Sequence, residues 1–203
     1  MNITEIFADK VLKLKIQKEL PELFYLAELE CSRAGKIGME VGSVREKVLI
    51  ALLIYKFDIK NITTDKITEP EIDVKLSDNP ISIKTITGNS FSGVKLIWTV
   101  DWDKVIEFSQ TYRPACDILP VQIHWDAQGA LYLIPRSIQE NIIQKLGINQ
   151  YLKLPKQSTN PRGVEISQEA LKILVSNPQA SSIPIFWKRN QINFDPYARW
   201  LEL

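Results

Sequence analysis

The sequence predicts a mixed α+β protein with a mixed central sheet flanked by helices. Residues 69–86 alternate apolar and polar side chains with period two, which is typical of strands, whereas the segments before and after them have helical spacing. With 203 residues, of which 45% are hydrophobic, the chain is long enough to form one sizeable core.

The N-terminal part of the chain is predicted to be helical. Apolar residues at helical spacing in 3–30, with Pro21 as a break, predict two helices, and the glycine-rich segment 35–42 predicts a loop. Ser43 followed by Glu46 is a capping-box signature, so we expect a helix over Val44–Phe57. We therefore expect an N-terminal helical segment, 1–34, and a single domain, 35–203.

Residues 69–86 predict two antiparallel strands joined by the turn Ser77–Pro80. If that turn is a four-residue loop, Leu76 faces Ile81 and Asp73 lies directly opposite Lys84. Strand parity then separates a polar face from a face that anchors the hairpin in the core. The polar face carries Glu71, Asp73, Lys75, Ser82 and Lys84, and the apolar face carries Ile72, Val74, Leu76, Ile81 and Ile83.

The rest of the chain continues the mixture of strands and helices. The predicted elements are a strand over 94–100, a helix over 102–110, a hairpin of 117–125 with 130–134, and helices over 137–146 and 167–175. The last two helices are separated by a polar stretch, 153–163, which we expect to be a loop.

Composition excludes several classes of protein and of chemistry. Two cysteines and one histidine, His124, provide neither a disulfide framework nor a zinc site, and they leave little room for a histidine-based triad. The most apolar run, 48–54, is far shorter than a membrane span, and the N-terminus lacks the basic start of a secretory signal, so we expect a cytoplasmic protein without a membrane partner. Any catalysis is therefore expected to use carboxylates and lysine.

Charge is distributed unevenly along the chain. Residues 61–110 hold eight acidic and five basic side chains, whereas residues 111–203 hold seven acidic and ten basic ones. An acidic centre beside basic surfaces suits a metal-dependent enzyme that acts on nucleic acid, although an ordinary solvated surface gives the same counts.

The hairpin residues resemble the PD-(D/E)xK nuclease motif. Glu71-Ile72-Asp73 is followed by Lys84 eleven residues after Asp73, and the resemblance implies a restriction-endonuclease-like core in which Asp73 binds a metal and Lys84 is catalytic. The expected metal is Mg²⁺, with Mn²⁺ as a substitute. Ser82 stands where the family has its second acid, so another carboxylate must replace it.

Glu46 is our first choice for the missing acid, and Glu71 and Glu107 are the reserves. The predicted catalytic residues are thus Asp73, Lys84 and Glu46, and the predicted metal ligands are Asp73, Glu46, Ile83 and Glu71. Two structural interpretations compete with this one: Glu46 belongs to a helix cap, and Asp73 with Lys84 forms an ordinary cross-strand ion pair.

Segments 42–48, 82–88 and 154–165 resemble small type II restriction enzymes of the ThaI group. This resemblance implies a Mg²⁺-dependent, site-specific endonuclease that hydrolyses phosphodiester bonds of double-stranded DNA as a homodimer, without a small-molecule cofactor. Two alternatives stay open: a repair or junction-resolving nuclease of the same fold, and a non-catalytic DNA-binding module.

Candidate DNA contacts are polar residues near the motif and in the basic stretch 153–163, together with one apolar residue that could wedge between bases. They are Ser82, Thr85, Thr87, Asn89, Ser90, Lys153, Lys156, Gln157, Ser158, Thr159, Asn160, Arg162 and Met39. An ordinary polar loop is the competing interpretation of 153–163.

Overall fold

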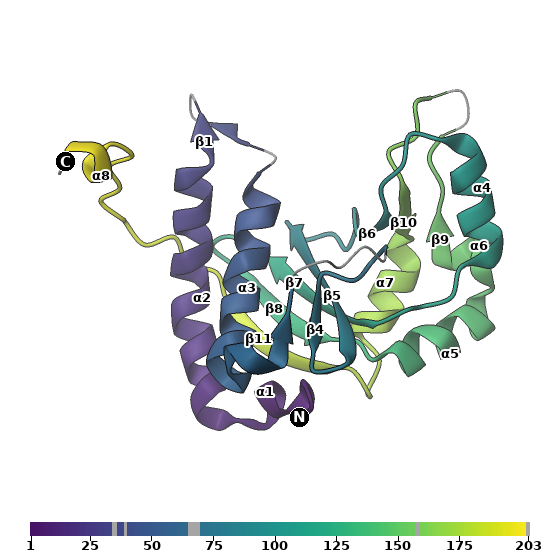
Figure 1. Ribbon diagram of the computed structural model, residues 1–203, viewed down its shortest axis with the longest axis horizontal. Helices are drawn as coiled ribbons and strands as arrows, with labels where there is room; N and C mark the ends of the chain where they lie inside the picture. Colours follow the sequence, from purple (N-terminus) through teal and green to yellow (C-terminus); the bar gives the residue numbers. More distant parts are fainter. Residues whose placement is uncertain (34–35, 39, 65–69, 157–158, 202–203) are drawn as a thin grey trace.

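The protein is built around a six-stranded mixed sheet, seen in a computed structural model that describes residues 1–33, 36–38, 40–64, 70–156 and 159–201 (Figure 1). The strand order is β11-β8-β7-β5-β4-β3, and β5 and β7 run parallel whereas the other neighbours are antiparallel. The strands are β3 (Ile62–Thr63), β4 (Val74–Leu76), β5 (Asn79–Thr87), β7 (Asp117–Ile123), β8 (Gln128–Leu133) and β11 (Ser181–Phe186).

Helices and two small sheets surround the central sheet. The helices are α1 (Thr4–Ala8), α2 (Lys10–Glu30), α3 (Val41–Phe57), α4 (Trp102–Thr111), α5 (Arg136–Leu146), α6 (Ile148–Tyr151), α7 (Gln168–Val175) and α8 (Ala198–Leu201), with a 3-10 turn η1 at Ile59–Asn61. One small sheet pairs β1 (Ser32–Arg33) with β2 (Lys36–Ile37), and the other has the order β6 (Lys95–Ile97), β10 (Val164–Ile166), β9 (Leu152–Lys153).

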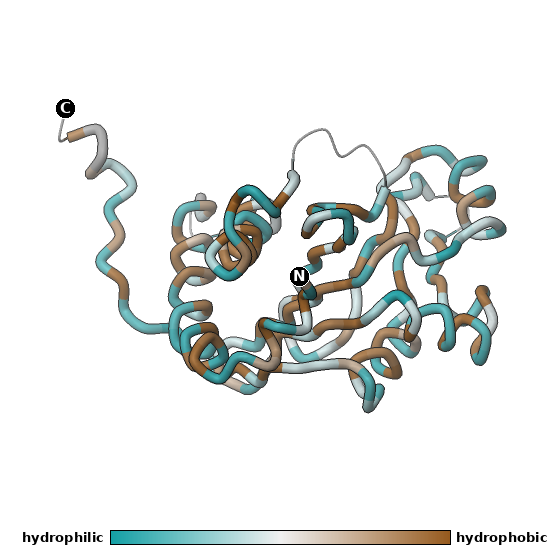
Figure 2. Tube along the Cα trace, turned by 60° about the horizontal axis from the view of Figure 1, so that its bottom comes forward, coloured by the Kyte–Doolittle hydropathy of each residue, from teal (hydrophilic) through white to brown (hydrophobic). Residues whose placement is uncertain are grey.

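Each face of the central sheet has its own hydrophobic cluster. Helices α1, α2 and α3 pack on one face, where Phe24 and Leu49 meet strand residues such as Leu119. The other cluster joins the opposite face to α4–α7 and to the small sheet of β6, β9 and β10. Figure 2 shows hydrophobic central strands and outer helices of mixed hydropathy, as expected for a sheet that is buried on both faces.

Two helices are present near the N-terminus as predicted, but the break lies elsewhere. Asp9 separates α1 from α2, and its carboxylate accepts a hydrogen bond from the Leu12 amide at 3.0 Å as an N-cap. Pro21 lies inside α2 and is buried, so the prediction of a break at Pro21 is wrong. Proline removes only one helical hydrogen bond, and the packing of α2 on the sheet outweighs that loss.

Helix α3 begins earlier than the capping-box signature predicts. It starts at Val41, its N-cap is Glu40, and the side chain of Glu40 makes no capping hydrogen bond. Ser43 therefore lies inside the helix, and the capping-box interpretation of Ser43 and Glu46 is wrong. Glu46 is consequently free of a capping role.

The central hairpin forms, but with a different register. Val74 pairs with Ile81 and Leu76 with Asn79, because the turn is the pair Ser77–Asp78, with Ser77 at φ 55°, rather than a four-residue loop. The register is shifted by two residues from the predicted one. A shift of two keeps every side chain on its face, so the prediction of an apolar anchor is confirmed at Val74 and Ile83, which are buried in the first cluster.

Several other elements agree with the sequence patterns. Strands β7 and β8 form the predicted hairpin, and α4, α5 and α7 are found within one or two residues of their predicted bounds. The segment predicted as a strand over 94–100 forms only the short β6. Strand β11 was not predicted. Its proline, Pro184, is tolerated because β11 is an edge strand that pairs only with β8.

Candidate active site

Asp73 and Lys84 form the centre of the site. Asp73 immediately precedes β4, Lys84 lies in the middle of β5, and Lys84 Nζ is 2.9 Å from Asp73 Oδ2. Both side chains are accessible, with 22% of Asp73 and 19% of Lys84 exposed. In the observed register the two residues are diagonal rather than directly opposite, and the long lysine side chain spans the difference.

The backbone and Ser82 fix the position of the Asp73 carboxylate. Oδ2 accepts hydrogen bonds from the Ile83 amide at 2.6 Å and from the Ser82 hydroxyl at 3.2 Å, in addition to Lys84. Three donors on one oxygen hold the carboxylate in one orientation. Ser82 is buried, with 2% exposed, which disfavours its predicted role as a DNA contact and gives it a role in holding Asp73 instead.

Glu46 lies on α3 within electrostatic reach of both hairpin residues. Partial burial raises the pKa of Glu46, the negative charge of Asp73 raises this pKa further, and the Lys84 ammonium partly opposes both effects. The charges of Asp73 and Lys84 thus both act on the Glu46 carboxyl group, which is consistent with its prediction as the missing second acid. Its role as a metal ligand stays a prediction.

The reserve acids lie beside a neighbouring pocket of about 530 Å³, whose lining includes Pro70, Glu71, Trp98, Lys104 and Glu107. Burial raises the pKa of Glu71 to about 7, an effect that the Ala115 backbone and Lys84 partly oppose. Glu71 has φ 73°, a conformation that costs free energy for a residue with a β-carbon and that is concentrated at functional sites.

The donor chemistry of this region suits Mg²⁺. Asp73 and Glu46 offer carboxylate oxygens, which Mg²⁺ prefers, and Mg²⁺ commonly uses one or two carboxylates and fills its other positions with water. Within the described ranges, no group of three or more His, Cys, Asp or Glu residues lies close enough to hold a metal ion. The predicted set of Asp73, Glu46, Glu71 and the Ile83 carbonyl is therefore not preassembled as a cage, and the metal assignment stays a prediction.

Residues after Lys84 lead out of β5 toward solvent. Thr85 and Ser90 are partly buried, whereas Thr87 and Asn89 are exposed. The Thr87 hydroxyl accepts a hydrogen bond from Arg45 Nη1 at 3.2 Å. No local pattern could predict this contact, because it joins two residues 42 positions apart.

The polar stretch 153–163 connects β9 to β10 and borders a hollow of about 510 Å³ whose lining includes Lys153, Lys156, Thr159, Asn160 and Arg162. Lys153 Nζ is 2.9 Å from Glu165 Oε2, and the Thr159 carbonyl accepts a hydrogen bond from Trp102 Nε1 at 3.1 Å. The candidates Met39, Gln157 and Ser158 lie outside the described residues.

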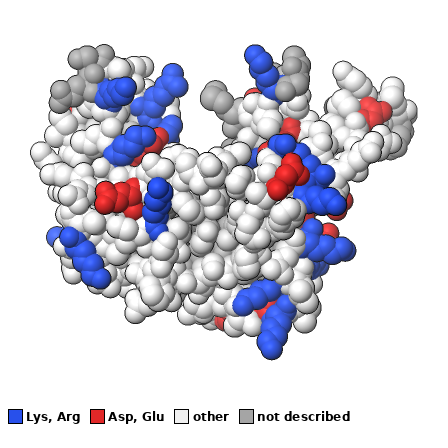
Figure 3. Space-filling view, turned by 180° about the vertical axis from the view of Figure 1, so that it is seen from behind, with Lys and Arg blue, Asp and Glu red and all other residues white. Residues whose placement is uncertain are grey.

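Two lobes stand on either side of a hollow, as the space-filling view from behind shows (Figure 3). One lobe contains α2 and α3, the other contains α4, α6, β9 and β10, and lysine and arginine side chains lie on both (Figures 1 and 3). Basic side chains on both lobes suit contact with the phosphate backbone of a nucleic acid.

Among the described helices, none is both long enough and apolar enough to span a bilayer.

A family model for the restriction endonuclease ThaI matches residues 6–203 of this chain. The chain belongs to the ThaI restriction endonuclease family. As a member of the ThaI family it is a restriction endonuclease, an enzyme that acts on DNA, and the resemblance inferred from three short segments is confirmed.

A solved structure described as a restriction endonuclease in complex with substrate DNA is also similar. It shares 52% sequence identity with the chain, covers 98% of this chain and 97% of its own, and superimposes with a TM-score of 0.92. The predicted restriction-endonuclease-like fold, a mixed central sheet flanked by helices, is therefore confirmed for this member of the ThaI family. A comparison with curated proteins found no match.

Proposed function

We propose that the protein is a type II, site-specific restriction endonuclease that hydrolyses phosphodiester bonds of double-stranded DNA with Mg²⁺. The observation that carries this proposal is the contact of 2.9 Å between Lys84 Nζ on β5 and Asp73 Oδ2 immediately before β4. The similar structure described with substrate DNA supports DNA as the substrate.

Asp73 and Glu46 would hold the metal. The three donors to Asp73 all reach Oδ2, so Oδ1 is available for a cation as far as the described residues are concerned. A bound Mg²⁺ would supply Lewis-acid stabilisation of the charge that develops on the phosphate oxygens. Mn²⁺ accepts the same oxygen ligands and is expected to substitute.

Lys84 would act on the attacking water. Its ammonium group is oriented by Asp73, so its remaining protons can hold a water molecule beside the scissile phosphate and offset the negative charge of the transition state. Ser82 supports this geometry indirectly because its hydroxyl donates to Asp73. Charge stabilisation and positioning of this kind account for most of the rate enhancement in phosphoryl transfer.

A homodimer is part of the proposal. Cleavage of both strands of a palindromic site requires two active sites related by twofold symmetry, and a dimer with one site per subunit supplies them. Sedimentation equilibrium of the free protein would report twice the 23.3 kDa chain mass if this is right, and a complex of one chain per cognate duplex would contradict it.

The decisive experiment is digestion of long, sequence-diverse duplex DNA with and without Mg²⁺. We expect wild type to give fixed fragments only with metal, and Asp73→Asn and Lys84→Ala to give none. Lys56→Ala is the matched control, because the Lys56–Asp9 contact of 2.8 Å has the same chemistry and similar burial at the far end of α3. Intact DNA with wild type at all Mg²⁺ and Mn²⁺ concentrations would contradict the proposal, and cleavage of branched DNA alone would favour the repair or junction-resolving alternative.

A further inference from the structure

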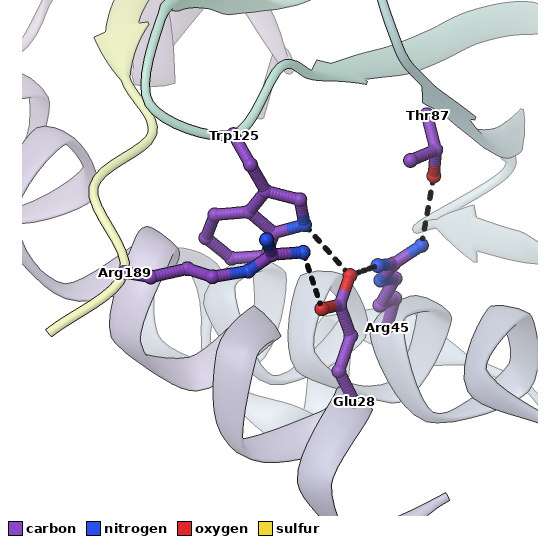
Figure 4. A network of polar contacts seen from close by, with 5 residues as sticks. All are labelled: Glu28, Arg45, Thr87, Trp125 and Arg189. Carbon is purple, nitrogen blue, oxygen red and sulfur yellow. Dashed lines mark hydrogen bonds and ion pairs between the residues drawn. The ribbon is translucent and has the colours of Figure 1, made fainter. Parts of the chain in front are cut away.

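A polar network joins α2 and α3 to the end of β5, the strand that carries Lys84 (Figure 4). At its centre is Glu28 near the end of α2, whose side chain is 4% exposed. Glu28 Oε1 accepts from Arg45 Nη2 and from Trp125 Nε1, the latter at 2.8 Å, and Oε2 accepts from Arg189 Nη2 at 3.3 Å. A buried carboxylate with three donors is fixed in place, because moving it would leave charges unpaired in a poorly solvated region.

Arg45 connects this network to the strand that carries Lys84. One end of its guanidinium, Nη2, is held by Glu28, and the other, Nη1, donates to the Thr87 hydroxyl at 3.2 Å. Arg45 is itself only 4% exposed, whereas Thr87 is exposed at the end of β5, three residues beyond Lys84. The planar guanidinium thus reaches from a fixed buried partner to a surface hydroxyl.

The direction of that hydrogen bond determines what Thr87 can do. A threonine hydroxyl has one proton to donate and two lone pairs to accept with. Because arginine can only donate, Thr87 Oγ1 is the acceptor in this contact. Among the described residues no acceptor takes the Thr87 proton, which is therefore available for an outside acceptor. Phosphate oxygens of DNA are acceptors of this kind, and they favour donors near positive charge.

We propose that Arg45 is a positioning residue that holds Thr87 so that its hydroxyl donates to a phosphate of the bound DNA at the end of β5, beyond the scissile one. This inference rests on the proposed function, since it assumes that the DNA bound at Lys84 continues past the end of β5. It also links the DNA contact to the segment after β11, because Arg189 shares Glu28 with Arg45.

The chain offers a matched control for an ordinary ion pair between the same two helices. Lys56 on α3 contacts Asp9, the N-cap of α2, with Nζ 2.8 Å from Oδ2. Lys56 is eleven residues, or roughly 16 Å along an ideal helix, from Arg45. A purely structural role for Arg45 predicts that Lys56→Met and Arg45→Lys change stability only, with no specific effect on DNA binding.

The test is a double-mutant cycle on metal-free binding to a duplex that wild type cleaves. The variants are Thr87→Val, Arg45→Lys, the double variant, Thr87→Ser and Lys56→Met. We expect Thr87→Val to weaken binding roughly tenfold, which is the loss of one charge-assisted hydrogen bond. Arg45→Lys keeps a positive charge beside Glu28 but lacks the second nitrogen that donates to Thr87, so it should lose a similar amount of DNA affinity. The double variant should bind no more weakly than either single variant.

Thr87→Ser should bind as wild type does because it keeps the hydroxyl, and Lys56→Met should do the same because it leaves the site intact. Thermal unfolding should show that exposed Thr87→Val is as stable as wild type, so its binding loss cannot come from misfolding. Wild-type affinity of Thr87→Val, or additive losses in the double variant, would overturn this inference alone. A wild-type protein that neither binds nor cuts DNA would overturn the proposed function and this inference together.

Discussion

Asp73–Lys84 and Glu28–Arg45 are both contacts between a carboxylate and a cation, yet they differ in burial and in the way the chain builds them. About a fifth of each side chain is exposed in the first pair, and 4% of each in the second. The first pair lies on one hairpin, and the second is part of a network that draws on five separate segments, including α2, α3 and the end of β5. Accessibility suits a pair that must meet a substrate, whereas burial suits one that holds other groups in place.

Removing the charge of Lys84 should affect catalysis far more than stability. Lys84→Met should lower the cleavage rate by at least about a hundredfold, the usual contribution of a positioned acid, base or charge at a reacting group. Its free energy of unfolding should change by no more than about 1 kcal/mol, since partly exposed ion pairs contribute little. Single-turnover cleavage and urea unfolding measure the two quantities. A large loss of stability would indicate that Lys84 has a structural role like that of Arg45.

Glu28→Gln should have the opposite profile. It removes a buried charge from between two guanidinium groups, so we expect a loss of about 3–5 kcal/mol in the free energy of unfolding. Glu28→Asp is the control, because it keeps the charge and shortens the side chain. Chemical denaturation gives the values, and a Glu28→Gln protein as stable as wild type would show that the buried charge does not stabilise the fold.

Glu71 provides a pH-dependent comparison. Its folded pKa of about 7 lies above the ordinary value of 4.5, so the unfolded chain loses this proton first as the pH rises. Because of this group, the free energy of unfolding falls as the pH rises from 4.5 to 7, and it falls no further above pH 7. The difference in stability between Glu71→Gln and wild type should therefore shift in favour of the variant when the pH is raised from 5 to 8. Thermal unfolding measures this difference, and the same value at both pH values would refute the burial of an ionisable Glu71.

The smallest expected effect concerns the stretch 153–163. Arg162→Ala should weaken duplex binding modestly for all sequences and reduce the slope of log affinity against log salt by about one, if Arg162 contacts a phosphate. A change in which sequences are cut would instead indicate a contact to a base edge. Binding titrations at several salt concentrations measure the slope, and digestion of sequence-diverse duplex DNA reports which sequences are cut, with Lys56→Ala as the control in both.

Local patterns in the sequence predicted much of this fold. The hairpin β7–β8 and the helices α4, α5 and α7 follow from alternation and helical spacing, and the polar face with Asp73 and Lys84 follows from strand parity. Parity is insensitive to a shift of two residues, which is why the pair could be predicted although the register was wrong. The spacing of the motif thus carried more information than the detail of the turn.

The features that were missed depend on contacts between distant parts of the chain. Pro21 stays within a helix because α2 packs on the sheet, and Glu40, not Ser43, occupies the N-cap of α3. Glu28 and Arg45 have no local signature that separates them from the charged side chains of an ordinary solvated helix. Only the folded chain shows that they meet.

The single parallel pairing of the central sheet also bears on how such enzymes diversify. Because β5 and β7 run in the same direction, the chain must cross over between them, and residues 88–116 of this crossover carry β6 and α4 of the second lobe. The Gly88 amide donates to the Ile123 carbonyl at 2.8 Å, which fastens the start of the crossover to β7. Insertions and deletions within the crossover would therefore reshape one wall of the cleft while the hairpin that carries Asp73 and Lys84 keeps its geometry.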